Sequence, residues 1–176
     1  MADRYDVSKM KAFWTVSLKT VKNSACFVME AEELRSAAVL IPNDKANVSV
    51  GRYIRSGGLG LIFKMGPRAV SRMLRFESMA TKIKSKYATP TCWYLYAFVT
   101  HPDFRGEGYG ARILQESLRF LDEARQDCYL ETLSSVNVEI YRHFGFELKE
   151  TVRIPDTDLT LYAMVKIYKE SATDRC

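Results

Sequence analysis

The chain has 176 residues, of which 47% are hydrophobic and 27% charged, and its net charge at neutral pH is +5. This balance predicts one soluble globular domain with a substantial core and excludes a disordered or fibrous chain. No apolar run reaches the ~20 residues that cross a bilayer, and the N-terminus lacks a signal-peptide pattern. Four widely spaced cysteines and two histidines indicate reduced thiols rather than disulfides or a zinc site. We therefore expect a cytoplasmic protein with no metal and no membrane attachment.

The first predicted elements are a helix and a hairpin. Residues 7–22 carry apolar side chains at helical spacing. Two short apolar runs, residues 26–29 and 37–41, flank a charged turn at residues 32–33 and predict a pair of antiparallel strands.

A basic, helix-patterned segment follows. Residues 49–86 contain nine basic side chains and one acid, Glu77. We expect two or three helices there, broken at the glycines of residues 57–60 and at Gly66-Pro67. The charge is typical of a solvated amphipathic face, and the alternative is a contact for ligand phosphates or an acidic partner. No nucleic-acid-binding motif accompanies it, so we do not expect nucleic acid as a partner.

The centre of the chain predicts a βαβ unit. Residues 93–100 form an almost uninterrupted apolar run, typical of a strand buried on both faces. Residues 111–124 carry leucines on one helical face, and a further strand-like run includes Tyr129. We expect the two strands to be parallel and the crossover to be right-handed.

The chain closes with a second antiparallel pair, residues 146–152 and 159–167, around a turn at Pro155. Residues 169–176 are expected to form a flexible tail. Residues 1–176 are thus expected to fold as a single domain.

The most informative segment is Arg105-Gly106-Glu107-Gly108-Tyr109-Gly110, between the strand and the helix of the βαβ unit. Three glycines in five residues let the backbone lie close to a ligand. The loop leads into a helix whose free N–H groups and dipole bind phosphate oxygens, and Arg105 adds a positive charge. The spacing matches neither the G-x-G-x-x-G dinucleotide fingerprint nor a P-loop. The alternative is a purely structural turn.

A second motif lies downstream, on a short helix expected to begin at Ser134-Ser135. Asn137 and Tyr141 are four residues apart and therefore share a face, and Gly145 suits the position that follows a helix. Taken alone, Tyr141 is interpreted as a packing tyrosine. Apolar residues with the same spacing predict one buried stripe, formed by Val136, Ile140 and Phe144.

The two motifs, R-x-x-G-x-G and N-x-x-x-Y-x-x-x-G-F, resemble those of the GCN5-related N-acetyltransferases (GNAT superfamily) in type and order. The resemblance runs from about residue 37 to 167 and is greatest to the branch of small microbial and fungal acetyltransferases related to puromycin-type resistance enzymes. It implies an α/β (α+β) GNAT fold, with a central, mostly antiparallel mixed sheet, a parallel βαβ pair at the cofactor cleft and flanking helices. Residues 49–88 would be a helical insert, and residues 1–25 a shortened N-terminal region in which the family's first strand is missing or much shortened.

The resemblance also implies acetyl-coenzyme A as cofactor and a set of site residues. Asn137 would touch the cofactor and Tyr141 would protonate the leaving thiolate. The backbone of Phe98, Val99 and Thr100 would hold the pantetheine arm. The pyrophosphate would be bound by Arg105, Gly106, Glu107, Gly108, Tyr109, Gly110 and Ala111.

The reaction needs a base, because a primary amine of pKa ~10 is mostly charged near neutrality and cannot attack a thioester. Glu131, at the end of the strand beside the expected cleft, is the candidate; the alternative is an ordinary exposed or salt-bridged glutamate. The expected function is acetyl transfer to a primary amine of a small molecule by direct attack in a ternary complex, in a monomer or homodimer. A protein lysine or N-terminal acetyltransferase and a non-catalytic acyl-coenzyme A-binding module are the alternatives.

Overall fold

The computed structural model describes residues 7–22, 24, 27–30, 35–46 and 50–169. Its strands form one six-stranded sheet in the order β1-β2-β3-β4-β6-β5, in which β3 and β4 are parallel and all other neighbours antiparallel. The predicted hairpin, βαβ unit and closing pair are therefore confirmed. No strand precedes β1 in the described part of the chain. The strands are β1 (Phe27–Glu30), β2 (Ser36–Pro42), β3 (Trp93–Thr100), β4 (Cys128–Thr132), β5 (Glu147–Arg153) and β6 (Thr160–Lys166).

The helices agree with the predicted segments. Helix α1 (Val7–Val21) precedes the hairpin, α6 (Tyr109–Glu123) joins β3 to β4, and α7 (Ser135–His143) follows β4. The predicted helical insert between β2 and β3 kinks at Gly57 and breaks at Gly66, both of which have positive φ. Its members are α2 (Asn43–Ala46), α3 (Val50–Tyr53), a π-helical turn (Ile54–Gly58), α4 (Leu59–Met65) and α5 (Pro67–Tyr87). No helix among the described residues is long and apolar enough to cross a membrane.

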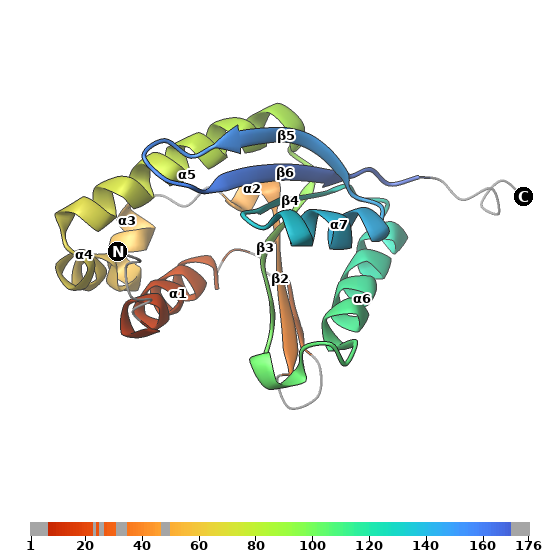
Figure 1. Cartoon of the computed structure of the whole chain (residues 1–176), viewed down its shortest axis with the longest axis horizontal. Coiled ribbons are helices and arrows are strands. Elements are labelled where there is room, and N and C mark those ends of the chain that lie inside the picture. Colours follow the sequence, from red (N-terminus) through yellow and green to blue (C-terminus); the bar gives the residue numbers. More distant parts are fainter. Residues whose placement is uncertain (1–6, 23, 25–26, 31–34, 47–49, 170–176) are drawn as a thin grey trace, which may run out of the picture.

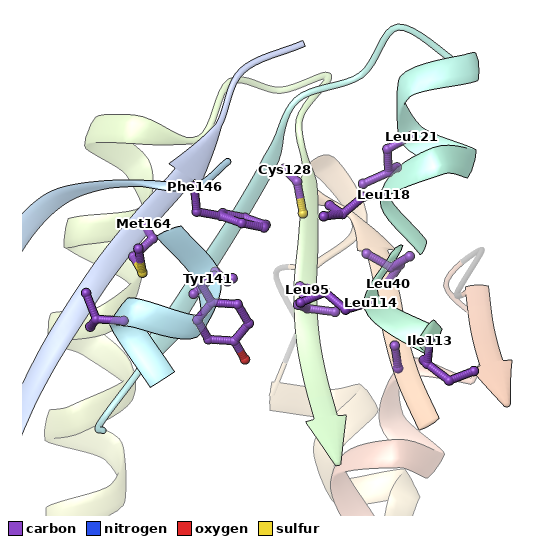
Figure 2. Packing of buried hydrophobic residues seen from close by; sticks show 13 residues of the cluster. Leu40, Leu95, Ile113, Leu114, Leu118, Leu121, Cys128, Tyr141, Phe146 and Met164 are labelled. Carbon is purple, nitrogen blue, oxygen red and sulfur yellow. The ribbon is translucent and has the colours of Figure 1, made fainter. Parts of the chain in front are cut away.

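The two faces of the sheet are covered by different helices (Figure 1). Side chains alternate along each strand, so neighbouring residues contribute to opposite cores. On one face Leu130 packs with leucines of α6 and with Tyr141 of α7 (Figure 2). On the other face Tyr129 packs with Ala80 and Ile83 of α5, and the end of α1 covers β2. Helix α6, which follows the glycine loop, and the Glu131 side chain, which shares the face of Tyr129, therefore lie on opposite sides of the sheet.

The sheet opens between β3 and β4. Their register joins Trp93 to Cys128 and Tyr94 to Tyr129, and goes no further. Beyond this point β3 remains paired with β2 and β4 with β6. In β3 the pairing with β2 shifts at Tyr96, which has no partner in the register and bends the strand as a β-bulge does. One edge of β3 is thus left without a strand partner.

One expectation about α7 is wrong. Val136 and Ile140 are 69% and 46% exposed, and the buried residues of this helix are Val138 and Tyr141. A four-residue spacing marks a helical face but does not say which face meets the core. Tyr141 lies against Phe146, which continues the chain into β5, and this contact turns the Tyr141 face inward.

Candidate active site

The glycine loop forms an open bend between β3 and α6. A short 3-10 turn, Pro102–Phe104, leads into it, and the exposed residues Arg105 to Gly108 follow. Gly106 and Gly108 have φ values of +86° and +83°, a region that side chains other than glycine disfavour. A Cβ built on either glycine meets no atom within 4 Å, so the space above the loop is open. Gly108 caps α6 without a side-chain hydrogen bond, which leaves first-turn N–H groups directed outward.

The third glycine has a packing role. A Cβ on Gly110 would lie 2.8 Å from Oγ1 of Thr100 and 3.3 Å from the ring of Phe98. Gly110 therefore lets the start of α6 lie directly on the end of β3. Ala111, exposed on the first turn, continues the row of backbone N–H groups.

Arg35 ties this loop to β2, a contact that the sequence analysis missed. Its guanidinium carbon lies 5.1 Å from the ring centroid of Phe104 and 5.0 Å from that of Tyr109, and it donates a hydrogen bond to the Tyr109 hydroxyl. The guanidinium carbon of Arg112 also lies over the Tyr109 ring, 5.4 Å from its centroid. Two guanidinium groups thus lie against the Tyr109 ring at the end of the loop. No local pattern marks Arg35, because its partners are about 70 residues away.

Beside the loop, β3 presents backbone groups to the opening. The His101 N–H donates to the Arg35 carbonyl at 2.8 Å, and opposite pairs in an antiparallel ladder alternate between bonded and non-bonded. The N–H and C=O of Val99 therefore point to β2, and its carbonyl also accepts from Ser36 Oγ at 3.0 Å. Those of Phe98 and Thr100 point toward β4. Of the three predicted pantetheine contacts, Phe98 and Thr100 face the opening with their backbone.

Tyr141 lies on the α7 side of the opening. It is 7% exposed, and its ring centroid is 6.4 Å from that of Phe98 on β3. Figure 2 shows the hydroxyl end of the ring turned toward β3. Burial, with a smaller contribution from Cys128, raises the pKa of Tyr141 to about 12. The hydroxyl therefore keeps its proton at neutral pH and can donate it.

Asn137 lies one turn earlier on α7. Its side-chain amide donates to Thr132 Oγ1 at 3.4 Å, and its backbone N–H donates to Ser134 Oγ, which caps the helix. The end of β4 thus fixes the position of the amide near the opening.

Glu131 lies on the opposite face of the sheet from Tyr141. Its Oε1 accepts from the Tyr129 hydroxyl at 2.7 Å and its Oε2 from the Tyr94 hydroxyl at 3.2 Å. Burial raises the pKa of Glu131, and the two hydrogen bonds and the charge of Lys84 oppose that rise. The side chain is partly exposed. It is therefore not an ordinary surface glutamate, and within the described part of the chain it has no salt-bridge partner.

Two residues of α5, Lys84 and Glu77, add charges near the hydrogen-bonded group of Glu131, Tyr94 and Tyr129. Lys84 is 7% exposed, so the expectation of a solvated basic face is wrong at this position. Other basic residues of the helix do lie at the surface, where Lys86 pairs with Glu150 and Arg75 with Asp156. Glu77 is open to solvent, yet enough protein surrounds its carboxyl group that desolvation raises its pKa. In Figure 1 α5 runs along the top of the view and the glycine loop lies at the bottom, so these charges do not border the loop.

Metal and disulfide chemistry has no candidate residues here. Among the described residues, no group of three or more His, Cys, Asp or Glu side chains could hold a metal ion. Cys92 and Cys128 are buried free thiols. Cys26 and Cys176, like most of the predicted tail, lie outside the described residues.

Comparisons with known proteins identify the domain type. Residues 76–148 match a family model described as an acetyltransferase (GNAT) domain. A comparison with curated protein sequences finds no match. Residues 76–148 therefore carry the features of a GNAT acetyltransferase domain, the domain of an acyltransferase whose donor is acetyl-coenzyme A.

Solved structures agree in fold. One from Corynebacterium glutamicum, described as histone acetyltransferase HPA2 and related acetyltransferase, has a TM-score of 0.58 and 18% identity over 94% of this chain and 77% of that chain. An agmatine N-acetyltransferase has a TM-score of 0.56 and 16% identity, over 92% of this chain and 83% of that chain. The ribosomal-protein-S18-alanine N-acetyltransferase of Escherichia coli has a TM-score of 0.52 and 11% identity, over 99% of this chain and 84% of that chain. At these identities the likeness establishes the fold alone.

Proposed function

We propose that the chain transfers an acetyl group from acetyl-coenzyme A to a primary amine of a small molecule, by direct attack within a ternary complex. The opening between β3 and β4 supports this most strongly. A proton donor, Tyr141, borders it on one face of the sheet, and a carboxylate, Glu131, lies on the other face. An acetyl group held in the opening would be reached by the amine from the Glu131 side.

The donor would be bound along the loop and the edge of β3. Arg105 and backbone N–H groups of residues 106–111 supply positive charge and hydrogen-bond donors to the pyrophosphate. Phe98 and Thr100 offer backbone groups to the amides of the pantetheine arm, as a neighbouring strand would. Asn137 adds an amide at the far side of the opening. This assignment accounts for the unpaired edge of β3.

The chemistry then requires two proton transfers in separate places. Glu131 takes a proton from the ammonium group of the acceptor, and the neutral amine attacks the thioester carbon. A β3 N–H can stabilise the oxyanion that forms. When the C–S bond breaks, Tyr141 gives its proton to the thiolate, and the nitrogen of the tetrahedral intermediate loses its extra proton through water, which restores the phenol, while Glu131 releases its proton to solvent. A base with a raised pKa and an acid that is still protonated at neutral pH suit these two roles.

The insert favours a small acceptor. Helices α1 and α5 cover the Glu131 face, and aromatic rings line the sheet between them, with Tyr94 and Tyr96 5.8 Å apart and Trp14 6.4 Å from Tyr96. Such rings bind apolar or cationic small molecules. The structural neighbours include an agmatine N-acetyltransferase and a ribosomal-protein-S18-alanine N-acetyltransferase, so the fold does not decide between a small-molecule and a protein acceptor. We assign the chain to the small-molecule, puromycin-type branch on its motifs and its insert.

Release of coenzyme A thiol from acetyl-coenzyme A tests this function. The purified protein is assayed with aliphatic diamines, amino sugars and amino nucleosides, and with lysine and N-terminal peptides of equal concentration. We expect turnover with a small amine and a product heavier by one acetyl group. Turnover with peptides alone would identify a protein acetyltransferase. Binding of coenzyme A without turnover of any amine would identify a non-catalytic module.

A further inference from the structure

The buried amino group of Lys84 has no role in the function proposed so far. Ala80, Ile83 and Lys84 form the face of α5 that packs on the sheet. Placing an ammonium group in such a position is costly unless other groups compensate its charge. The Lys84 Nζ lies 4.7 Å from the ring centroid of Tyr94, over its face, which provides one such compensation.

Tyr94 connects Lys84 to the candidate base. Its ring receives the ammonium group, and its hydroxyl donates to Glu131 Oε2. The second carboxylate oxygen accepts from Tyr129, so both oxygens of Glu131 have a phenol donor. The charged groups that act on Glu131 both come from α5: Lys84, which is positive, and Glu77, which is negative.

These groups have opposite effects on the proton of Glu131. Desolvation and Glu77 favour the neutral acid, whereas Lys84 and the two phenols favour the carboxylate, as the directions of their effects on the Glu131 pKa indicate. A base that already carries a proton cannot accept one from the acceptor ammonium. Among the described residues, Lys84 is the one cation in this balance, and it belongs to the helical insert.

We propose that Lys84 is a positioning residue that holds Glu131 in its carboxylate form, and with it the hydrogen-bonded arrangement of Tyr94 and Glu131. The inference rests on the proposed role of Glu131 as the base. It gives the insert a part in the reaction beyond covering the sheet.

The pH dependence of kcat/KM tests this inference. Lys84→Met is compared with the wild-type enzyme using one acceptor amine throughout, so that the amine's own titration cancels. We expect the rising limb of the profile to move up by about one pH unit or more, since a nearby opposite charge lowers a carboxyl pKa by ~1–3 units. The plateau should be recovered at alkaline pH. Lys84→Arg should keep the wild-type limb.

Controls separate this role from a structural one. Lys86→Met removes a surface lysine from the same helix and should leave the limb in place. Glu77→Gln should move the limb to lower pH, the opposite direction to Lys84→Met. If Lys84→Met does not fold, Lys84→Gln replaces it as the neutral variant, because its side chain ends in a polar amide. A folded neutral variant with the wild-type limb overturns the inference, and so does a failure to fold of both variants, since that marks Lys84 as structural.

Glu131→Gln distinguishes the inference from the function on which it rests. If Glu131→Gln loses about 10²-fold in kcat/KM while the Lys84 variants keep the wild-type limb, Lys84 alone has been misassigned. If Glu131→Gln keeps the wild-type rate and limb, Glu131 is not the base and both assignments fail.

Discussion

Replacing Tyr141 with phenylalanine removes one oxygen atom and leaves the ring in place. The ring contacts with Phe98 and Phe146, at centroid distances of 6.4 and 5.7 Å, do not involve the hydroxyl. The fold should therefore lose no more than ~1 kcal/mol, the typical net contribution of one polar group. The loss of a general acid, by contrast, costs roughly 10² to 10⁴ in rate. We expect kcat to fall by at least about 10²-fold, equivalent to ~2.7 kcal/mol of transition-state stabilisation.

The assay follows thiol release under saturating amine, with coenzyme A affinity measured separately by calorimetry. Coenzyme A affinity should barely change, because the proposed phosphate site is the glycine loop and not α7. Tyr162→Phe is the matched control, a tyrosine that packs partly buried against the same core from β6 and should keep full activity. An unchanged kcat in Tyr141→Phe would remove this residue from the mechanism. A parallel loss of rate, affinity and melting temperature would instead mark it as a packing residue.

The raised pKa of Tyr141 gives the wild-type enzyme a second expectation. A general acid works only while it is protonated, and this one loses its proton near pH 12, where burial has placed its pKa. The profile of kcat should therefore show no falling limb due to this group between about pH 6 and pH 10. A falling limb in that range that disappears in Tyr141→Phe would mean that the hydroxyl titrates as an ordinary phenol.

Three further predictions concern the loop and the base. Gly110→Ala places a Cβ 2.8 Å from Thr100 Oγ1, so we expect ~1–3 kcal/mol of destabilisation in chemical denaturation and weaker coenzyme A binding; wild-type values for both would contradict the close packing. Arg35→Ala removes the guanidinium between Phe104 and Tyr109 and should raise the Kd of coenzyme A about tenfold with little change in kcat, whereas an unaltered Kd would show that the loop holds its shape without it. Because burial raises the pKa of Glu131 above 4.5, folding favours its protonated form, and stability should fall as the pH rises from the unfolded-state pKa through the folded-state pKa. Glu131→Gln should remove this fall, so its melting temperature should exceed that of the wild type at neutral pH but not near pH 4. If the melting temperatures of the variant and the wild type change equally with pH, the desolvation argument is refuted.

Local patterns in the sequence predicted the backbone of the site well. The glycine loop, the strand before it and the helix after it are close in sequence, and the spacing of glycines and apolar residues is enough to fix their order. The same kind of pattern failed at Val136 and Ile140, because the buried face of α7 depends on Phe146 and the sheet, not on the helix itself. Arg35 and Lys84 were missed for a related reason. Arg35 contacts Tyr109, 74 residues away, and the burial of Lys84 depends on how α5 packs on the sheet, so nothing in the neighbourhood of either residue marks it.

The opening of the sheet lets the proposed acid, Tyr141, and the proposed base, Glu131, serve one site from opposite faces. If Tyr141 and Glu131 lay on the same face, a direct hydrogen bond would let the phenol stabilise the carboxylate, and the proton needed by the thiolate would be shared with the base. The sheet separates them, and other phenols, Tyr94 and Tyr129, stabilise Glu131 instead. The acetyl group can lie between the two only where β3 and β4 no longer pair, beyond Tyr94 and Tyr129. The register that ends at these two tyrosines therefore sets both where the strands part and which hydroxyls hold the Glu131 carboxylate.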